Sequence, residues 1–242
     1  MVEYRRMREG LVLTSCLHGG PIKLSEVAQA ETHPSWLERT ADLPVGTVAR
    51  LLTALCREYG SCGVMAIDGD AVIGKVRFAP AGLGDSIPEC CQQYPEAMAA
   101  FDPSRLPALD TLRPRSLRLW CLQVVDDDRY RRQGIATTMM KQTLAWAREA
   151  GWVTIEACAI VEVPPLLNWT GLFSLGAYRR LGFRVTGSRV SPELLEAVRH
   201  MRLGGHGEKV KEQWQAFAHL SDEEAATLWD VVLDLKEPPV ES

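Results

Sequence analysis

The sequence predicts an α/β protein built around a strand–helix–strand unit. SLRLWCLQVV (116–125) and VTIEACAIV (153–161) are apolar runs, and residues 136–150 between them place apolar side chains at helical spacing. Such runs are typical of strands buried on both faces, and a helix that connects two of them indicates locally parallel pairing. We therefore expect a sheet with a parallel strand pair at its centre.

Upstream of this unit, the sequence predicts an edge strand, a helix and a β-hairpin. VEYRRM (2–7) is the candidate edge strand, and VGTVARLLTALCREYG (45–60) has helical spacing with Gly60 placed to end the helix. CGVMAI (62–67) and AVIGKVRF (71–78) are β-like runs separated by DGD. An Asp-Gly pair between two such runs is a strong signal for a hairpin.

Residues 79–114 interrupt the pattern with repeated prolines and no long apolar run. A connection of this length is either a functional loop or lid, or an insertion without a role, and the residues do not decide between them. We expect one domain over residues 1–190 that carries this long loop insertion.

Residues 191–242 are predicted to form a helical, acidic C-terminal extension. They carry 11 acidic and 5 basic residues, whereas the first 190 residues carry 20 and 22. Ser221 and Glu224 form a capping-box pattern, which predicts a helix over 221–235. Its apolar stripe must pack on the domain or on a partner, and a homodimer through it is one alternative. The stripe consists of Ala225, Leu228, Trp229, Val232 and Leu233.

The composition is that of an ordinary globular protein, with 46% hydrophobic and 24% charged residues and a net charge of −4. No segment is basic enough to predict a nucleic-acid partner. No apolar run approaches the roughly 18–20 residues of a membrane span. The charged start, MVEYRRMREG, lacks the apolar centre of a signal peptide, so we expect a cytoplasmic protein without a membrane partner.

Seven cysteines occur without a spacing that predicts a metal site. They are Cys16, Cys56, Cys62, Cys90, Cys91, Cys121 and Cys158. We expect reduced thiols and no metal, as in most cytosolic proteins. A strained redox pair of the adjacent Cys90 and Cys91 stays open as an alternative.

The junction RYRRQGIA (129–136) joins the first apolar run to the helix that follows. The first amides of a helix lack intrahelical partners and, together with the helix dipole, form an anion site. Gly134 leaves room for a phosphate, Ala136 stays small, and Arg131 and Arg132 add positive charge. The pattern is neither GxxxxGK[ST] nor GxGxxG, so it predicts neither a P-loop nor a dinucleotide fold.

Arg131-x-x-Gly134-x-Ala136 resembles the pyrophosphate loop of the GNAT superfamily of acyl-CoA-dependent N-acyltransferases. YRRLGF (178–183) resembles the Tyr-x-x-Leu-Gly-Phe end of the last helix in that fold. Tyr178 follows Arg131 by 47 residues, a spacing typical of the family. The two motifs in this order make the resemblance specific across about 115–187.

The resemblance implies a mixed, mostly antiparallel sheet with flanking helices and a central parallel pair, 117–125 and 153–160, splayed for coenzyme A. Acetyl-CoA would be the co-substrate, with its pantetheine arm bonded by backbone groups near Val124 and Val125. The pyrophosphate would lie on the loop. Its contacts would be Arg131, Arg132, Gln133, Gly134, Ile135, Ala136 and Thr137.

Two features depart from the family pattern. The lead-in VVDDDRY is one residue longer than usual, which predicts an altered bulge at the end of the strand. Gly171 stands where the family often has an asparagine, and Asn168 is the candidate substitute. The aspartates of the lead-in, Asp126 to Asp128, are expected to be a solvated run.

For the chemistry, the resemblance implies Tyr178 as the general acid that protonates the leaving thiolate. A buried packing role for its ring is the alternative. Glu156 lies within an apolar strand, where a carboxylate is costly, and it is our candidate general base. An ion pair of Glu156, a base role for Glu162 and a water molecule as base stay open.

The expected function is therefore an N-acetyltransferase that transfers the acetyl group of acetyl-CoA to a primary amine by direct attack. The acceptor is a small molecule or a protein, and no motif says which. The alternative is a non-catalytic acyl-CoA-binding or interaction module, which the missing asparagine and the acidic extension favour.

Overall fold

The computed structural model describes residues 1–27, 29, 45–83 and 106–236. Most of the predicted insertion over 79–114 lies outside the described residues, as do Cys90 and Cys91. The expectations about that loop and about a redox pair therefore stay predictions.

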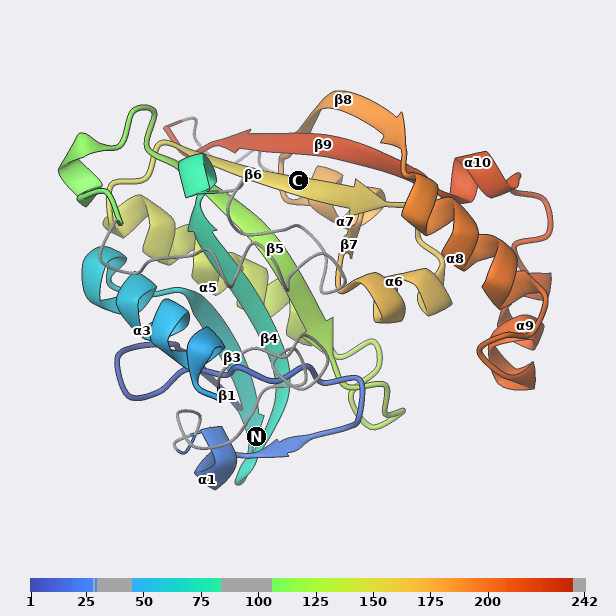
Figure 1. Cartoon of the computed structure of the whole chain (residues 1–242), viewed down its shortest axis with the longest axis horizontal. Coiled ribbons are helices and arrows are strands. Elements are labelled where there is room, and N and C mark those ends of the chain that lie inside the picture. Colours follow the sequence, from blue (N-terminus) through green and yellow to red (C-terminus); the bar gives the residue numbers. More distant parts are fainter. Residues whose placement is uncertain (28, 30–44, 84–105, 237–242) are drawn as a thin grey trace.

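Among the described residues, nine strands form one sheet, which Figure 1 shows running across the molecule. Its main path is β1 (Val2–Arg6), β3 (Gly63–Asp68), β4 (Ala71–Pro80), β5 (Ser116–Val124), β6 (Thr154–Ile160), β9 (Thr227–Asp234) and β8 (Arg184–Val190). Two short strands lie off this path, β2 (Ile22–Lys23) beside β4 and β7 (Phe173–Ser174) beside β6. Only β5–β6 and β6–β7 pair in parallel, which confirms the mixed, mostly antiparallel sheet.

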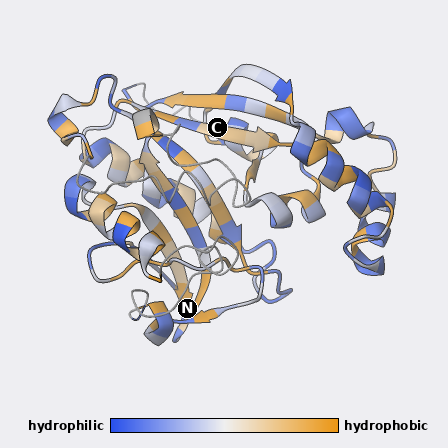
Figure 2. Cartoon of the chain, viewed as in Figure 1, coloured by the Kyte–Doolittle hydropathy of each residue, from blue (hydrophilic) through white to orange (hydrophobic). Residues whose placement is uncertain are grey.

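The helices flank this sheet. They are α1 (Leu24–Val27), α3 (Thr47–Tyr59), α5 (Ile135–Glu149), α6 (Pro164–Thr170), α7 (Leu175–Arg180), α8 (Pro192–Arg202), α9 (Glu208–Gln215) and α10 (Asp222–Ala225). Short 3-10 turns span Ala81–Leu83 and Leu109–Thr111. Figure 2 shows hydrophobic residues along the central strands, whereas α9 and α10 are mostly hydrophilic.

The predicted edge strand, helix and hairpin are confirmed by β1, α3 and the β3–β4 pair. Gly60 ends α3 in the left-handed conformation, at φ 83°, and its amide donates to the Cys56 carbonyl. Gly69 has φ 61° in the hairpin turn, a conformation that side chains other than glycine rarely adopt. The Asp-Gly pair therefore predicted the hairpin correctly because Gly69 can adopt the left-handed conformation that the turn requires.

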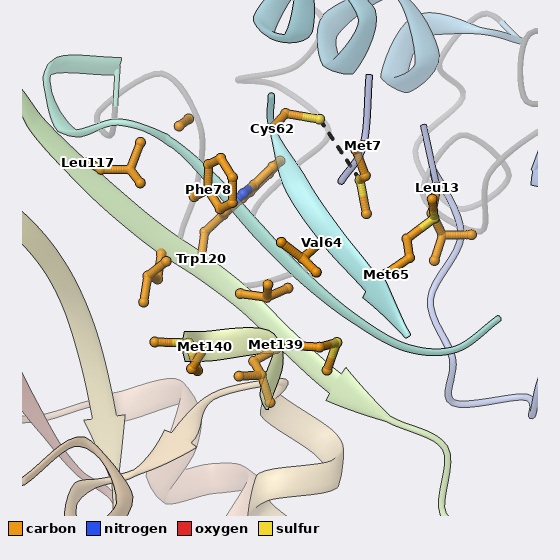
Figure 3. Close-up of a cluster of buried hydrophobic side chains, with 14 of the residues drawn as sticks. Met7, Leu13, Cys62, Val64, Met65, Phe78, Leu117, Trp120, Met139 and Met140 are labelled. Atoms are coloured by element: carbon orange, nitrogen blue, oxygen red, sulfur yellow. Dashed lines mark hydrogen bonds between the residues drawn. The ribbon is translucent and has the colours of Figure 1, made fainter. Parts of the chain in front are cut away.

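The main core fills the space between α5 and the strands β3, β4 and β5, and it extends to α3 and to Met7 and Leu13 of the N-terminal segment (Figure 3). Phe78 stacks on Trp146 of α5 with ring centroids 4.7 Å apart. A Cβ at Gly74 would come within 3.0 Å of Met139, so the glycine allows α5 to approach the sheet. Methionines fill much of this core, and Met139 and Met140 are fully buried.

The parallel strands β5 and β6 separate soon after they begin. Only Ser116, Leu117 and Arg118 of β5 pair with β6. Beyond them, β7 pairs with β6 in place of β5, and the Leu122 amide of β5 donates to the Gly171 carbonyl, 2.6 Å away. The predicted splayed pair is thus confirmed, with residues 171–174 lying between the diverging strands.

A β-bulge lies within β5 rather than at its end. Arg77 of β4 pairs with Cys121 and Phe78 pairs with Leu119, which leaves Trp120 as the extra residue. The longer lead-in predicted an altered bulge at the end of the strand, and that position is wrong.

The helix predicted over 221–235 is wrong. The capping box of Ser221 and Glu224 is present, but it starts only the four-residue α10, and β9 follows. Val231 and Leu233 are buried in the sheet between β6 and β8, whereas Val232 between them is half-buried. The segment 191–242 therefore contributes a strand to the same sheet as residues 1–190, and the apolar stripe packs within this chain.

None of the described helices combines the length and the apolarity that a membrane span requires.

Candidate active site

At the junction between β5 and α5, a row of backbone amides has no hydrogen-bond partner among the residues that the structure describes. Gly134 has φ 71° and Arg132 has φ 58°, both in the left-handed region. Within the described part of the chain, the first amide to bond into the helix is that of Thr138, which donates to the Gly134 carbonyl. Among the described residues, the backbone amides of 131–137 donate no backbone hydrogen bond. The helix also has no side-chain cap, because Gly134 at the cap position has no side chain that could accept from these amides. Successive free amides of this kind form a concave anion-binding nest.

The arginines of this junction pair with the aspartates of the lead-in. Arg131 lies 2.5 Å from Asp126 and 3.0 Å from Asp128, and Arg129 lies 2.7 Å from Asp127. The hydrogen bond to Asp126 raises the pKa of Arg131. The aspartate run lies at the solvent-exposed surface as expected, and each of its carboxylates also pairs with an arginine of the junction. These exposed pairs order the loop and offset its negative charge.

A pocket of about 630 Å³ adjoins this loop at the carboxyl end of β5. Its walls come from the 17–18 loop, β5, the start of α5, α6, β7 and the helices α8 and α9. The lining residues are Leu17, His18, Leu122, Gln123, Val124, Asp126, Ala136, Pro165, Leu167, Asn168, Trp169, Leu172, Phe173, Met201, His206, Lys209, Val210 and Gln213. Three predicted site residues, Val124, Ala136 and Asn168, thus meet at one cavity. The Val125 amide instead donates to Ile73 in the sheet, 2.9 Å away.

A polar cluster that the sequence did not indicate holds one wall of this pocket. His18 Nε2 lies 2.7 Å from Gln123 Nε2 and 2.8 Å from the Asn168 carbonyl. The buried Gln123 also accepts a bond from the Leu17 amide at 3.1 Å. The only sequence signal was a glutamine inside an apolar strand. The cluster ties the N-terminal loop to β5 and α6.

Tyr178 is buried, with an exposed fraction of 3%, on α7. Its ring contacts Phe173 at 5.4 Å and Phe183 at 4.8 Å between centroids. Burial raises the pKa of Tyr178 well above its ordinary value, so its hydroxyl stays protonated at neutral pH. Phe173, not Tyr178, lines the pocket, so the tyrosine lies behind this ring.

Glu156 lies apart from the 630 Å³ pocket. It is half-buried on β6, and Ser116 donates its hydroxyl to Glu156 Oε1 at 2.5 Å. The carboxylate lines a second hollow of about 450 Å³ that also includes Arg118, Arg184 and Asp230. The cost of a carboxylate in an apolar strand is thus avoided by a hydrogen bond and by access to this hollow.

The cysteines of the two central strands are poor nucleophiles. Cys121 and Cys158 are buried, and burial raises the pKa of Cys158. A raised pKa keeps the sulfur in its less reactive thiol form. Among the described residues, no group of three or more metal-binding side chains comes together.

A splayed parallel strand pair beside a loop of free backbone amides is the arrangement found in one class of protein, the acyltransferases. The model of the acetyltransferase (GNAT) family matches residues 24–183. The chain belongs to this family and is an acyltransferase, which confirms the resemblance in the motifs around Arg131 and Tyr178.

Several solved structures are similar to this chain, all at low sequence identity. Ard1 from Thermoplasma volcanium is 12% identical with a TM-score of 0.43, covering 98% of this chain and 99% of that one. The ribosomal-protein-S18-alanine N-acetyltransferase from Escherichia coli is 9% identical with a TM-score of 0.44, covering 98% and 96%. A GNAT family acetyltransferase from Elizabethkingia anophelis with acetyl-CoA bound is 12% identical with a TM-score of 0.37, covering 74% and 81%. No curated protein matches the sequence. Likeness at this level says nothing about the acceptor.

Proposed function

We propose that the chain is an N-acetyltransferase that moves the acetyl group of acetyl-CoA to a primary amine of a small molecule or protein by direct attack. The observation that carries this proposal is the amide nest at 131–137, which lies beside a splayed strand pair in a member of the acetyltransferase family.

The loop fits a pyrophosphate. A Cβ at Gly134 would meet nothing within 4 Å, so the space above the nest is open. The residues that would hold the phosphates are Arg131, Arg132, Gln133, Gly134, Ile135, Ala136 and Thr137. Val124 and Asn168 would line the path of the pantetheine arm, whereas Val125 can offer its carbonyl but not its amide. The paired Arg131 supports this site chiefly by ordering the loop.

Bound acetyl-CoA supplies an activated acyl thioester. The acceptor must be a neutral amine, and Glu156 is the candidate to remove a proton from its ammonium form. Tyr178 holds a proton on its hydroxyl at neutral pH and is the candidate donor to the leaving group. The nitrogen loses a second proton after the neutral amine has attacked the thioester, and the leaving thiolate gains one, so each acetylation of an ammonium group releases one proton to solvent and needs no cysteine nucleophile.

The test is calorimetric titration with acetyl-CoA, followed by thiol release in the presence of primary amines. We expect micromolar binding, and Tyr178→Phe should keep that affinity while turnover falls by about 10²-fold or more. Glu156→Gln should behave in the same way. Absence of acetyl-CoA binding in the folded protein would refute the proposal.

One observation favours the alternative of a non-catalytic acyl-CoA-binding module. Residues 171–174 lie between the diverging strands, and Phe173 separates Tyr178 from the pocket. A module of this kind would bind acetyl-CoA and release no thiol with any amine, so the same experiment distinguishes the two functions.

A further inference from the structure

A second hollow of about 450 Å³ lies over four strands of the sheet. It is lined by Arg118, Glu156, Ala157, Arg184, Thr186, Asp230, Val231 and Val232. Phe78 of β4 faces α5, so its neighbour Ala79 faces the other way, and Ala79 pairs with Arg118. The charged side chains of the hollow therefore lie on the sheet face opposite α5.

The strand register places two of these charges in one row. Glu156 of β6 is opposite Val232 of β9, and Val232 is opposite Arg184 of β8. Residues directly opposite one another share a face, and each strand spacing is about 4.8 Å. The backbone positions of Glu156 and Arg184 are therefore about 10 Å apart, within reach of one small molecule between their side chains.

The other carboxylate of the hollow is already neutralised. Asp230 Oδ1 lies 2.7 Å from the Arg189 guanidinium and also accepts a hydrogen bond from the Cys158 thiol at 3.5 Å. Glu156 is bonded only by the Ser116 hydroxyl, and Arg184 is exposed with no ion pair within the described part of the chain. Glu156 and Arg184 thus offer a ligand one anion and one cation, and Arg118, which is opposite Glu156 in the strand register, adds a second positive charge to the hollow.

We infer that this hollow binds the acceptor, and that the acceptor is a small amino acid-like molecule with a free carboxylate as well as its primary amine. This inference rests on the proposed function. The Arg184 guanidinium matches a carboxylate in shape and charge, and Glu156 would bind the ammonium group. A volume of this size suits a small molecule. A polycationic acceptor would meet two arginines, Arg118 and Arg184, in the same cavity.

The experiment measures thiol release with the twenty common amino acids, each offered as the free acid and as its methyl ester. We expect at least one free acid to be acetylated, with at least a tenfold lower kcat/KM for its ester. Arg184→Ala should raise KM for the free acid at least tenfold and leave the ester unchanged, and Arg184→Lys should recover part of the loss. Arg5→Ala, an exposed arginine on the far edge strand, is the matched control and should change neither.

Acetyl-CoA affinity, measured by calorimetry on the same proteins, separates the two proposals. No binding by the unchanged protein refutes the acetyltransferase function itself. Normal binding together with equal activity on acid and ester overturns the acceptor inference alone. Activity only on peptides, or on none of the free amino acids, overturns it too. A KM effect of Arg184→Ala that is the same for acid and ester indicates a structural role and also overturns it.

Discussion

Gly134 is the residue at which the anion site can be tested most directly. Its φ of 71° costs any other side chain about 1–2 kcal/mol, and a Cβ there meets no atom within 4 Å. Gly134→Glu should therefore fold, with a melting temperature lowered by about 2–8 °C for a chain of this size. The substitution also adds a negative charge beside the amides of 131–137.

The expected loss of acetyl-CoA affinity follows from this charge. Two unit charges roughly 6 Å apart repel by about 2.8 kcal/mol at an effective dielectric constant of 20 and by about 0.7 kcal/mol in bulk water. The dissociation constant should rise by between about 3-fold and 100-fold, more at low salt. Calorimetric titration at two salt concentrations measures this change.

Gly60→Glu supplies the matched control. Gly60 has φ 83° and open space at its Cβ, but it ends α3 instead of opening α5. The Gly60→Glu variant should lose about as much thermal stability as Gly134→Glu but keep the acetyl-CoA affinity of the unchanged protein. Equal loss of affinity in both variants, or none in Gly134→Glu, would refute the assignment of the anion site to this loop.

Three further predictions concern stability and the covered tyrosine. Burial raises the pKa of Tyr59 to about 12, against about 10 in the unfolded chain, so its contribution to stability is complete below pH 10 and is lost as the pH rises toward 12. Tyr59→Phe should therefore make the free energy of unfolding in urea less dependent on pH between pH 10 and 12. The same pH dependence in the variant and the unchanged protein would contradict this. Val231→Asp should lower the free energy of unfolding by about 3 kcal/mol or more, because it buries a charge in the sheet. Leu203→Asp, at an exposed residue, should change it by no more than about 0.5 kcal/mol. Chemical denaturation measures both changes. Phe173→Ala should expose Tyr178 to the pocket and raise kcat, at a stability cost of about 1–3 kcal/mol, and a lower kcat would show that the ring positions substrate instead.

The sequence predicted the central strand–helix–strand unit because its signals are local. The apolar runs, the helical spacing of α5 and the Asp-Gly turn each depend on neighbouring residues. The nest at 131–137 was predictable for the same reason, since a glycine and a helix start lie next to each other in the chain.

The error at 221–235 shows where local signals fail. Ser221 and Glu224 do start a helix, and a short apolar run after a cap fits both helical and strand spacing. The run is rich in tryptophan and valine, which favour strands, and its burial between β6 and β8 decided the outcome. Those partners are more than 35 residues away in the sequence, so no local pattern contains them.

The polar features of the two cavities were equally hidden. Gln123 contacts His18 across 105 residues, and Glu156 shares its hollow with Arg184 through the register of β9. Long-range register decides such contacts, and the spacing of residues along one strand does not reveal it.

The position of β9 has a consequence for how the protein is made. On the ribosome, β6 and β8 leave the exit tunnel well before β9, because the 36 residues 191–226 are synthesised between β8 and β9. At about 5–20 residues per second, one edge of β6 and the whole of β8 wait seconds for their shared neighbour. Unpaired strand edges recruit other chains. We expect nascent chains stalled before residue 227 to bind chaperones, and chains released beyond residue 234 to escape them.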